Sequence, residues 1–209
     1  MTLPQSGTLE EVQDFLGDCR RCRLCETRKN IVFGVGDPTA DLVVLGEAPG
    51  AVEDQRALPF VGRAGKMLDK MLVNVLELHR DEVYILNIIK CRPPDNRNPV
   101  QDEVSRCLPF LQMQLDLIQP KVILLMGSVA LRALFAVDHG ITRIRGEWME
   151  WGGIPVMPTF HPAYLLRLDA KQRRSSGQER VHEHKIRSWE DLKELRLRYD
   201  ELSGKRLPS

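Results

Sequence analysis

Short apolar runs alternate with segments of helical periodicity along the middle of the chain. The runs 42–45, 83–89 and 121–126 are almost wholly apolar, which is typical of strands buried on both faces of a parallel sheet. Between them, apolar residues recur at three- and four-residue spacing over about 64–78 and 100–118, the pattern of helices with one buried face. Strands that alternate with helices predict an α/β fold in which helices cover a parallel sheet.

Turn residues divide the C-terminal part of the chain. Ser128, directly after the third strand, is expected to cap a short helix. Gly152-Gly153 predicts a hairpin or a tight turn that leads into a last strand over 154–158. Residues 169–187 are polar and predict a loop, after which Ser188 is expected to open a final helix over about 189–203.

Composition indicates one ordinary globular domain over residues 1–209. The chain has a net charge of +1 and is 43% hydrophobic, without internal repeats. No segment approaches the ~18 apolar residues of a membrane span, and the N-terminus lacks the features of a signal peptide. We therefore expect no membrane partner and a cytoplasmic location. In that reducing compartment an odd count of five cysteines argues for metal ligation or buried thiols rather than disulfides.

Four of the cysteines form two widely separated pairs. Cys19 and Cys22 make a C-x2-C turn, and Cys91 and Cys107 follow in and after a Pro-rich loop over 91–99. Four thiolates suit zinc or an iron–sulfur cluster, and spacing alone leaves both open. Cys25 extends the first pair. Plain burial of the thiols is the alternative, but the arginine-rich surroundings at 20–23 fit a core poorly and a thiolate site well.

Polar and glycine-rich loops follow the predicted strands. In open parallel sheets, ligands bind beyond the carboxyl ends of the strands. There the chain carries two carboxylates, an aromatic ring, an amide and an imidazole, which together could hold a planar heterocycle: Glu53, Asp54, Phe60, Asn87 and His161. Taken singly, each has a structural explanation in helix capping, loop hydrogen bonding or core packing. The chain lacks the P-loop and the G-x-G-x-x-G motif, which disfavours nucleotide binding of those types.

The ordered motifs together resemble family 4 uracil-DNA glycosylases, the iron–sulfur branch of the uracil-DNA glycosylase superfamily. The resemblance runs from about Cys19 to Arg167. It rests on C-x2-C-x-L at 19–24, V-F-G-x-G at 32–36, G-E-A-P-G at 46–50 with E-D at 53–54, P-F-V-G at 59–62 with A-G at 64–65, N-I-I-K-C-R-P-P at 87–94, Cys107, and H-P-A-Y-L-L-R at 161–167.

The resemblance implies a cofactor and an architecture. The cofactor is a structural [4Fe-4S] cluster on four cysteines, with Cys25 as a non-ligand: Cys19, Cys22, Cys91 and Cys107. The cluster would tie the N-terminal segment 19–30 to the Pro-rich loop. The fold implied is a three-layer α/β/α sandwich with a four-stranded parallel sheet, which agrees with the strand–helix pattern.

The resemblance also implies a mechanism in which the uracil nucleotide leaves the base stack and enters the cleft. Phe60 stacks on the extruded ring, and the Asn87 carboxamide reads O4 and N3–H, a pattern that cytosine cannot match. Glu53 crowds the 5-methyl group of thymine. His161 donates a hydrogen bond to O2 as negative charge develops there, and Glu47 orients the attacking water.

Two positions depart from the related enzymes. Ala48 stands where family 1 glycosylases carry an aspartate for the water and where family 4 members often have glycine, so this site lacks that carboxylate. Ala57 replaces a common glycine in the loop before Phe60. Gly50 and Asp54, like Ala48, are expected in the substrate-binding loop.

Contacts to DNA are expected from two segments. Tyr164, Leu165, Leu166 and Arg167 resemble a loop that wedges into the minor groove and fills the gap left by the flipped base. The stretch 19–30 carries five Lys/Arg against one Glu, so it could meet phosphates although the whole chain is nearly neutral.

The function implied is base excision repair: hydrolysis of the N-glycosidic bond of uracil in single- or double-stranded DNA by a monomer, leaving an abasic site. One alternative is a non-catalytic nucleic-acid-binding module with a four-cysteine zinc or iron–sulfur site. A second is a branch of the superfamily that traps the sugar covalently through a His in an inserted loop after the second strand. The loop that follows the second strand here, Lys90-Cys91-Arg92-Pro93-Pro94, contains no such His, which disfavours a covalent trap.

Overall fold

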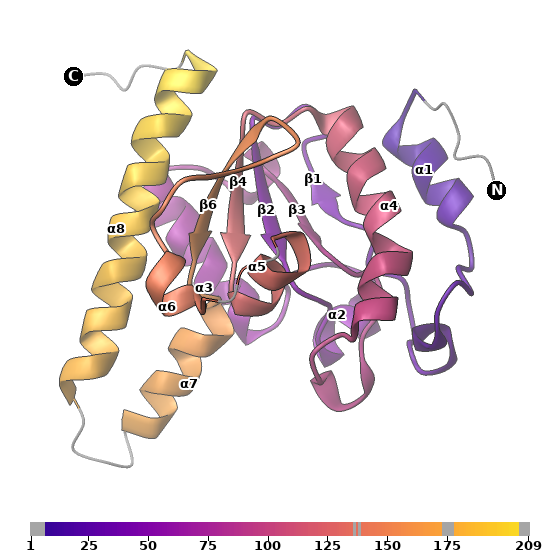
Figure 1. The fold of residues 1–209 in the computed structure, drawn as a ribbon, viewed down its shortest axis with the longest axis horizontal. Coiled ribbons are helices and arrows are strands. Elements are labelled where there is room, and N and C mark those ends of the chain that lie inside the picture. Colours follow the sequence, from indigo (N-terminus) through magenta and orange to yellow (C-terminus); the bar gives the residue numbers. More distant parts are fainter. Residues whose placement is uncertain (1–6, 136, 138, 173–177, 205–209) are drawn as a thin grey trace.

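The computed structural model describes residues 7–135, 137, 139–172 and 178–204, which form an α/β fold around one twisted sheet (Figure 1). The four predicted strands are confirmed as β2 (Leu42–Gly46), β3 (Tyr84–Asn87), β4 (Val122–Met126) and β6 (Ile154–Thr159). They lie side by side in the order β3-β2-β4-β6, and all three pairings are parallel. Their carboxyl ends therefore meet at one edge of the sheet.

Two short edge strands complete the sheet. β1 (Val35–Gly36) pairs antiparallel with β3, and β5 (Met149–Trp151) pairs antiparallel with β6 across the predicted Gly152-Gly153 hairpin. The sheet is therefore mixed and six-stranded: four parallel strands form its centre, and an antiparallel strand is added at each edge. Strands of two and three residues are too short to leave a periodic signal in the sequence.

Alternate residues of the strands serve two hydrophobic layers, because successive side chains of a strand point to opposite faces. Leu42 and Val44 pack toward α3 (Arg63–Met71), the π-helical turn η2 (Leu72–Leu76) and α8 (Gln178–Ser203). Val43 and Leu45 pack toward α4 (Gln101–Ile118), α5 (Ser128–Leu134) and α6 (Ile141–Ile144). Helices thus cover both faces of the sheet, as predicted.

The N-terminal segment packs on the outside of α4. Helix α1 (Leu9–Leu16) begins with a capping box between Thr8 and Glu11, and it buries Val12 and Leu16 against Phe110 of α4. The chain then passes through η1 (Arg23–Glu26), and the remaining elements are α2 (Ala51–Arg56), η3 (Arg80–Glu82), η4 (Pro94–Asn96) and α7 (Pro162–Gln172).

Several helix boundaries differ from the predictions. The helix predicted over about 64–78 is present as α3 and η2, and the one over about 100–118 is α4. Ser128 is the first residue of α5 rather than its cap; the cap position is Gly127, where φ is +93° and a Cβ would lie 2.9 Å from the Cβ of His161. The polar stretch 169–187 is helical over its described part, in α7 and α8.

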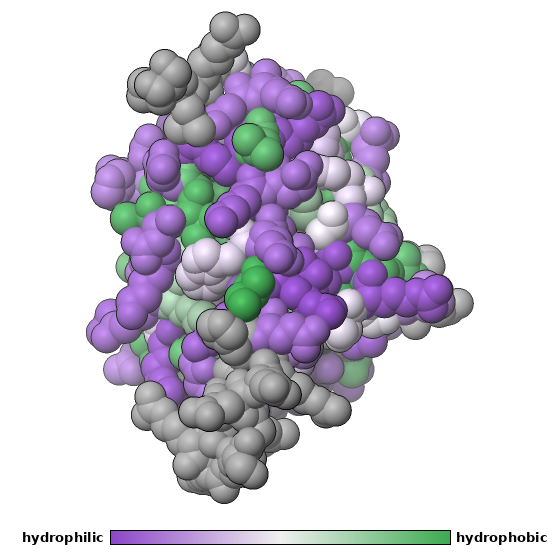
Figure 2. Space-filling model, turned by 90° about the vertical axis from the view of Figure 1, so that its left-hand side faces the viewer, coloured by the Kyte–Doolittle hydropathy of each residue, from purple (hydrophilic) through white to green (hydrophobic). Residues whose placement is uncertain are grey.

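Ser188 lies inside α8, where the prediction placed the start of a helix. It is buried, and its Oγ lies 3.2 Å from Oγ1 of Thr159 on β6. Figure 2 shows that the side of the molecule covered by α8 is largely hydrophilic with separate hydrophobic side chains. Two large hydrophobic residues of α8, Ile186 and Leu197, are exposed. A helix with a mostly solvated surface carries polar residues, which explains why composition alone indicated a loop. None of the described helices is long and apolar enough to cross a membrane.

Candidate active site

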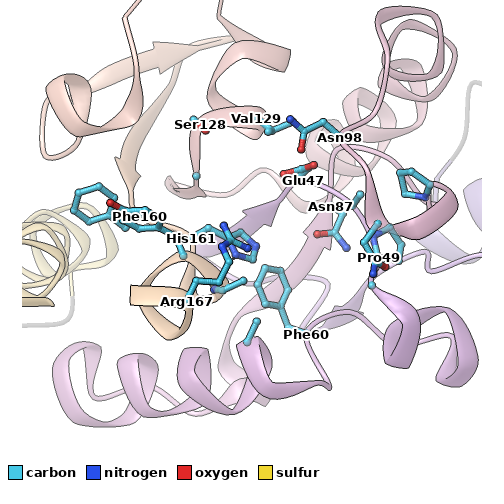
Figure 3. Close-up of a pocket in the computed structure, with 18 of the residues that line it drawn as sticks. Glu47, Pro49, Phe60, Asn87, Asn98, Ser128, Val129, Phe160, His161 and Arg167 are labelled. Carbon is cyan, nitrogen blue, oxygen red and sulfur yellow. The ribbon is translucent and has the colours of Figure 1, made fainter. Parts of the chain in front are cut away.

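A cleft of about 510 Å³ opens at the carboxyl edge of the sheet. Each central strand delivers one of its walls: Glu47 follows β2, Asn87 ends β3, Ser128 follows β4 and His161 follows β6. Phe60 closes it from the loop before α3. Figure 3 shows Glu47, Asn87, Phe60 and His161 around the same space. The structure thus brings together four of the residues to which the resemblance assigned roles.

Gly46 allows two of these side chains to approach the end of β2. A Cβ at this position would lie 2.4 Å from Oδ1 of Asn87 and 2.7 Å from the ring of Phe60. Real Cβ atoms do not tolerate such distances, so any larger residue here would push the amide and the ring apart. The first glycine of the G-E-A-P-G motif therefore allows Asn87 and Phe60 to lie close to each other at the end of β2.

Phe60 is buried and its ring stacks on the imidazole of His161, with ring centroids 5.6 Å apart and planes inclined by 27°. The loop that carries it is fixed by Glu53 of α2. Oε1 of Glu53 accepts hydrogen bonds from the backbone amides of Val61 at 3.0 Å and Gly62 at 2.8 Å. Glu53 also lines the cleft. It therefore forms part of the cleft wall and also fixes the loop that carries Phe60.

His161 has a defined hydrogen-bonding pattern. The backbone amide of Ala163 donates to its Nδ1 at 3.1 Å, so that nitrogen is an acceptor. Burial, and to a smaller extent the nearby charge of Arg167, lowers the pKa of His161 to about 4. The ring is therefore neutral at physiological pH, and its proton is on Nε2. His161 can donate one hydrogen bond from Nε2 without carrying a charge.

Glu47 titrates near neutrality. Burial raises its pKa to about 7, and the positive charges of Arg167 and Arg132 act in the opposite direction. Because its pKa lies near neutrality, Glu47 can be protonated or ionised at physiological pH. A positive charge that develops beside it favours the ionised form.

Asn87 presents an unused carboxamide. The residue is 2% exposed, and its side chain forms no hydrogen bond with the part of the chain that the structure describes. Its backbone carbonyl, by contrast, accepts a hydrogen bond from Nζ of the buried Lys90 at 2.8 Å. The backbone is thus fixed while one acceptor and two donors remain for a ligand.

The other predicted substrate-binding residues divide into two groups. Ala48 and Gly50 line the cleft, as predicted. Asp54 does not: it is 1% exposed, and its Oδ1 accepts hydrogen bonds from the backbone amides of Lys29 at 2.9 Å and Asn30 at 3.1 Å. Because neighbouring helix positions point about 100° apart, Glu53 faces the cleft while Asp54 faces the N-terminal segment. Asp54 therefore does not face the cleft; it joins α2 to that segment.

The four predicted wedge residues belong to α7 rather than to an extended loop. Tyr164 and Arg167, three positions apart, line the cleft. Leu165 is fully buried on the other side of the helix, and Leu166 is half-buried. Leu165 therefore anchors the helix and is not available to a groove.

The basic stretch 19–30 makes its contacts within the protein. Arg20 and Arg28 pair with Asp18, and Arg23 pairs with Asp102. The guanidinium of Arg21 lies over the rings of Phe15 and Phe110. Four of its five cations are thus engaged by neighbouring side chains, which disfavours the predicted phosphate contacts of this stretch.

Sequence reasoning missed several residues of the cleft. They lie in the segment after β3, at the start of α5, at the start of α6 or directly after β6: Pro93, Asn96, Arg97, Asn98, Ser128, Val129, Ile141, Thr142 and Phe160. The available signal was their place directly after predicted strands, since the loop over 91–99 was predicted correctly.

A second, smaller cavity is lined by Cys19, Cys22, Cys91 and Cys107, and Cys25 does not line it. Two of the sulfur atoms accept hydrogen bonds, Cys107 from the backbone amide of Lys90 at 3.3 Å and Cys19 from Arg21 at 3.4 Å. Such donors stabilise thiolate charge. Burial raises the pKa of Cys91 to about 12, and it also raises the pKa of Cys107, so without a bound metal these thiols are neutral.

Comparisons with known proteins place this geometry in context. The family model described as the uracil DNA glycosylase superfamily matches residues 33–193. A type-4 uracil-DNA glycosylase of Thermotoga maritima is 44% identical over 163 residues, 76% of this chain and 83% of the relative. Those of Sulfurisphaera tokodaii and Archaeoglobus fulgidus are each 41% identical over 167 residues, 76% of this chain, and 76% and 83% of the relatives.

Proposed function

The chain belongs to the uracil-DNA glycosylase superfamily, and from that premise we propose that it is a DNA repair enzyme of the type-4 class that releases uracil from DNA. The observation that carries the proposal is the convergence of Phe60, Asn87, His161 and Glu47 on one cleft. An aromatic face, a free carboxamide, a neutral imidazole and a carboxylate are what binding and hydrolysis of a uracil nucleotide require.

Uracil has to leave the base stack to reach this cleft, because the reacting groups lie at the end of a buried sheet. Flipping costs a few kcal/mol. Stacking of the extruded ring on Phe60 offsets that cost, since base–aromatic stacking is worth about 1–3 kcal/mol.

Asn87 supplies the discrimination against cytosine. Its Oδ1 accepts from N3–H of uracil and its Nδ2 donates to O4. Cytosine offers an unprotonated N3 and an amino group, so the same carboxamide would leave buried polar groups unpaired. The absence of competing side-chain hydrogen bonds for Asn87 among the described residues supports this role.

Glu53 excludes thymine by shape. Its carboxylate is fixed by hydrogen bonds from two backbone amides of the loop. Its Oε2 would lie 2.8 Å from a Cβ at Gly50. A side chain held in this way cannot swing aside for a 5-methyl group. The rejection of thymine therefore rests on a rigid wall.

His161 acts as a neutral donor. When the glycosidic bond breaks, negative charge develops on uracil O2, and Nε2–H of His161 donates to it. A preorganised donor in a water-poor site stabilises such charge strongly. The bond from Ala163 to Nδ1 keeps the proton on the nitrogen that faces the substrate.

Glu47 serves the sugar side. It is the only carboxylate in the G-E-A-P-G loop, because alanine stands at position 48, where family 1 glycosylases carry an aspartate. In its ionised form it faces the oxocarbenium cation and orients the water that captures it, and His161 keeps uracil as the leaving anion. Water, rather than a side chain, forms the new bond to the sugar and gives up a proton to the ionised Glu47. The uracil anion takes up a proton on its release, which leaves an abasic site and free uracil.

The four-cysteine cavity fits an iron–sulfur cluster better than a single ion. Among the residues that the structure describes, no three metal-ligating side chains converge closely enough to hold one ion. A [4Fe-4S] cluster takes each thiolate at a different iron, so its ligands are spread around a larger group. Held by Cys19, Cys22, Cys91 and Cys107, the cluster would supply a covalent link between the N-terminal segment and the cleft wall that begins at Pro93.

Helix α7 provides the DNA wedge in this proposal. Tyr164 and Arg167 face the cleft, with Leu166 half-buried beside them, and the buried Leu165 fixes the helix against the core. These three side chains would fill the space that the flipped nucleotide leaves.

The experiment that tests the function is release of free uracil from matched single-stranded oligonucleotides that contain one uracil, thymine or cytosine. We expect release from uracil alone, without added metal. Binding of the uracil oligonucleotide without release would instead establish a nucleic-acid-binding module. A protein–DNA adduct that survives hot detergent would establish a covalent trap.

A further inference from the structure

The backbone carbonyls of Pro59 and Phe60 are bound by the guanidinium of Arg80, from the short helix η3 before β3. Nη1 of Arg80 donates to the carbonyl oxygen of Phe60 at 3.0 Å, and Nη2 donates to that of Pro59. Nη1 also donates to Oδ1 of Asp69 on α3 at 2.9 Å. One planar cation therefore joins η3, α3 and the loop that carries the stacking ring, although Arg80 does not line the cleft.

Phe60 needs such support because of its backbone. Its φ is +51°, in the left-handed region that bulky residues avoid. A strained residue of this kind persists only where its surroundings determine its conformation. The Phe60 carbonyl also lies so close to α3 that a Cβ at Gly65 would be 1.7 Å from its oxygen. Gly65 makes room for the carbonyl, and Arg80 binds it.

The left-handed backbone decides where the ring points. Glu53 holds the two amides that follow Phe60, and Arg80 holds the carbonyls of Phe60 and of the residue before it. Both peptide planes that flank the Cα of Phe60 are thus hydrogen-bonded: the plane before it by Arg80 alone, and the plane after it by Arg80 and Glu53. If the hydrogen bonds from Arg80 to these two carbonyls were lost, Phe60 could relax to an ordinary backbone conformation. The ring would then move away from Gly46 and from its stack on His161.

We propose that Arg80, oriented by Asp69, is a positioning residue for uracil binding that acts by holding Phe60 in its left-handed conformation. The proposal rests on the proposed function, since it assigns Phe60 the role of stacking on the base. Stacking acts on the flipped base before and during bond cleavage alike. Loss of Arg80 should therefore raise KM and leave kcat nearly unchanged.

The variant Arg80→Met keeps the apolar stem and removes the donors. With single-stranded uracil DNA we expect KM to rise about tenfold and kcat to stay within about twofold, in proportion to the loss of one stacking contact. Arg80→Lys, which retains the charge and some donors, should lie between this variant and wild type. Arg56→Met is the matched control, because it removes the same charge from an exposed position on α2 and should change neither constant.

A double-mutant cycle shows whether the effect passes through Phe60. In a Phe60→Ala background, Arg80→Met should add no further rise in KM, because the ring it positions is gone. An equal rise in both backgrounds, or an effect no larger than that of Arg56→Met, would overturn the proposal. If Arg80→Met fails to fold, Asp69→Asn takes its place in the same cycle, with a smaller expected rise. Inactive wild-type protein would refute the proposed function, whereas active wild type with an additive cycle would refute only the role of Arg80.

Discussion

The backbone amide of Ala163 donates a hydrogen bond to Nδ1 of His161 at 3.1 Å, and this bond decides which ring nitrogen carries the proton. The sequence left open whether His161 acts neutral or charged. The bond and the burial of the ring together assign a neutral imidazole with its proton on Nε2, because burial holds the pKa at about 4. In the proposed mechanism, the group that donates to uracil O2 is therefore uncharged.

Removal of the His161 donor should lower the single-turnover rate of uracil release by about a hundredfold to a thousandfold, the usual cost of one oxyanion donor. His161→Phe removes the donor and keeps a planar ring beside Phe60, whereas His161→Asn restores a donor on a shorter side chain and should recover part of the rate. Nitrogen chemical shifts of the wild-type imidazole should report the neutral form at pH 6. An imidazolium at that pH would contradict the assignment.

Uracil release should depend on pH through Glu47. Because the ionised carboxylate faces the sugar cation, the single-turnover rate should rise with pH up to about 7 and then level off. His161, with its pKa at about 4, should add no second limb above pH 5. Glu47→Gln should be slower by about a hundredfold or more and lose the limb. A wild-type profile that is flat between pH 5 and 8 would remove Glu47 from the mechanism.

The same raised pKa predicts a stability effect of opposite sign to the activity effect. Folded Glu47 has a pKa of about 7 against an ordinary value of 4.5, so the folded state binds the proton more tightly. Its contribution to stability is present at low pH and is lost as pH rises through about 7. Glu47→Gln should therefore melt at a higher temperature than wild type at pH 8, with a smaller difference at pH 5. A pH-independent difference would count against this account.

Asn87→Asp should relax the discrimination against cytosine. A carboxyl group accepts from the cytosine amino group and, when protonated, donates to N3, which a carboxamide in the uracil-reading orientation cannot do. We expect slower release of uracil and a fall of the uracil-to-cytosine rate ratio by at least about a thousandfold. The rates are compared on matched oligonucleotides. An unchanged ratio would show that the base is read elsewhere.

The cysteines offer an internal control. Replacement of Cys19, Cys22, Cys91 or Cys107 by Ala should abolish the absorbance at about 400 nm expected for an iron–sulfur cluster and lower the melting temperature, whereas Cys25→Ala should retain both. Colourless wild-type protein with one bound zinc would replace the cluster by a zinc site. Loss of the absorbance in Cys25→Ala would contradict the ligand set.

The central strands and the site at their carboxyl ends were predictable because both depend on strong local patterns. Wholly apolar runs mark buried strands, and chemistry follows strand ends in parallel sheets. The edge strand β1 was not predictable, since a strand of two residues has no measurable period, and β5 was indicated only by the turn signal of Gly152-Gly153.

The direction of individual side chains was the harder part. Glu53 and Asp54 are adjacent and chemically alike, yet only Glu53 faces the cleft. Leu165 and Tyr164 differ in the same way on α7. Their roles depend on the rotation of a helix about its axis, which tertiary packing fixes. The contact between Arg80 and the Phe60 loop could not be predicted for another reason. Arg80 binds backbone carbonyls there, and these carry no signature in the sequence.

The most direct test of the account measures free uracil and abasic sites from one uracil-containing oligonucleotide, single-stranded and duplex, with wild type and with the Glu47→Gln, His161→Phe double variant. The account predicts one free uracil per abasic site with wild type in both contexts. It also predicts a double variant that still binds the DNA but releases uracil at least a thousandfold more slowly, in line with the loss of two catalytic groups. No release by wild type, or equal release by the double variant, would show that this cleft does not carry out the reaction.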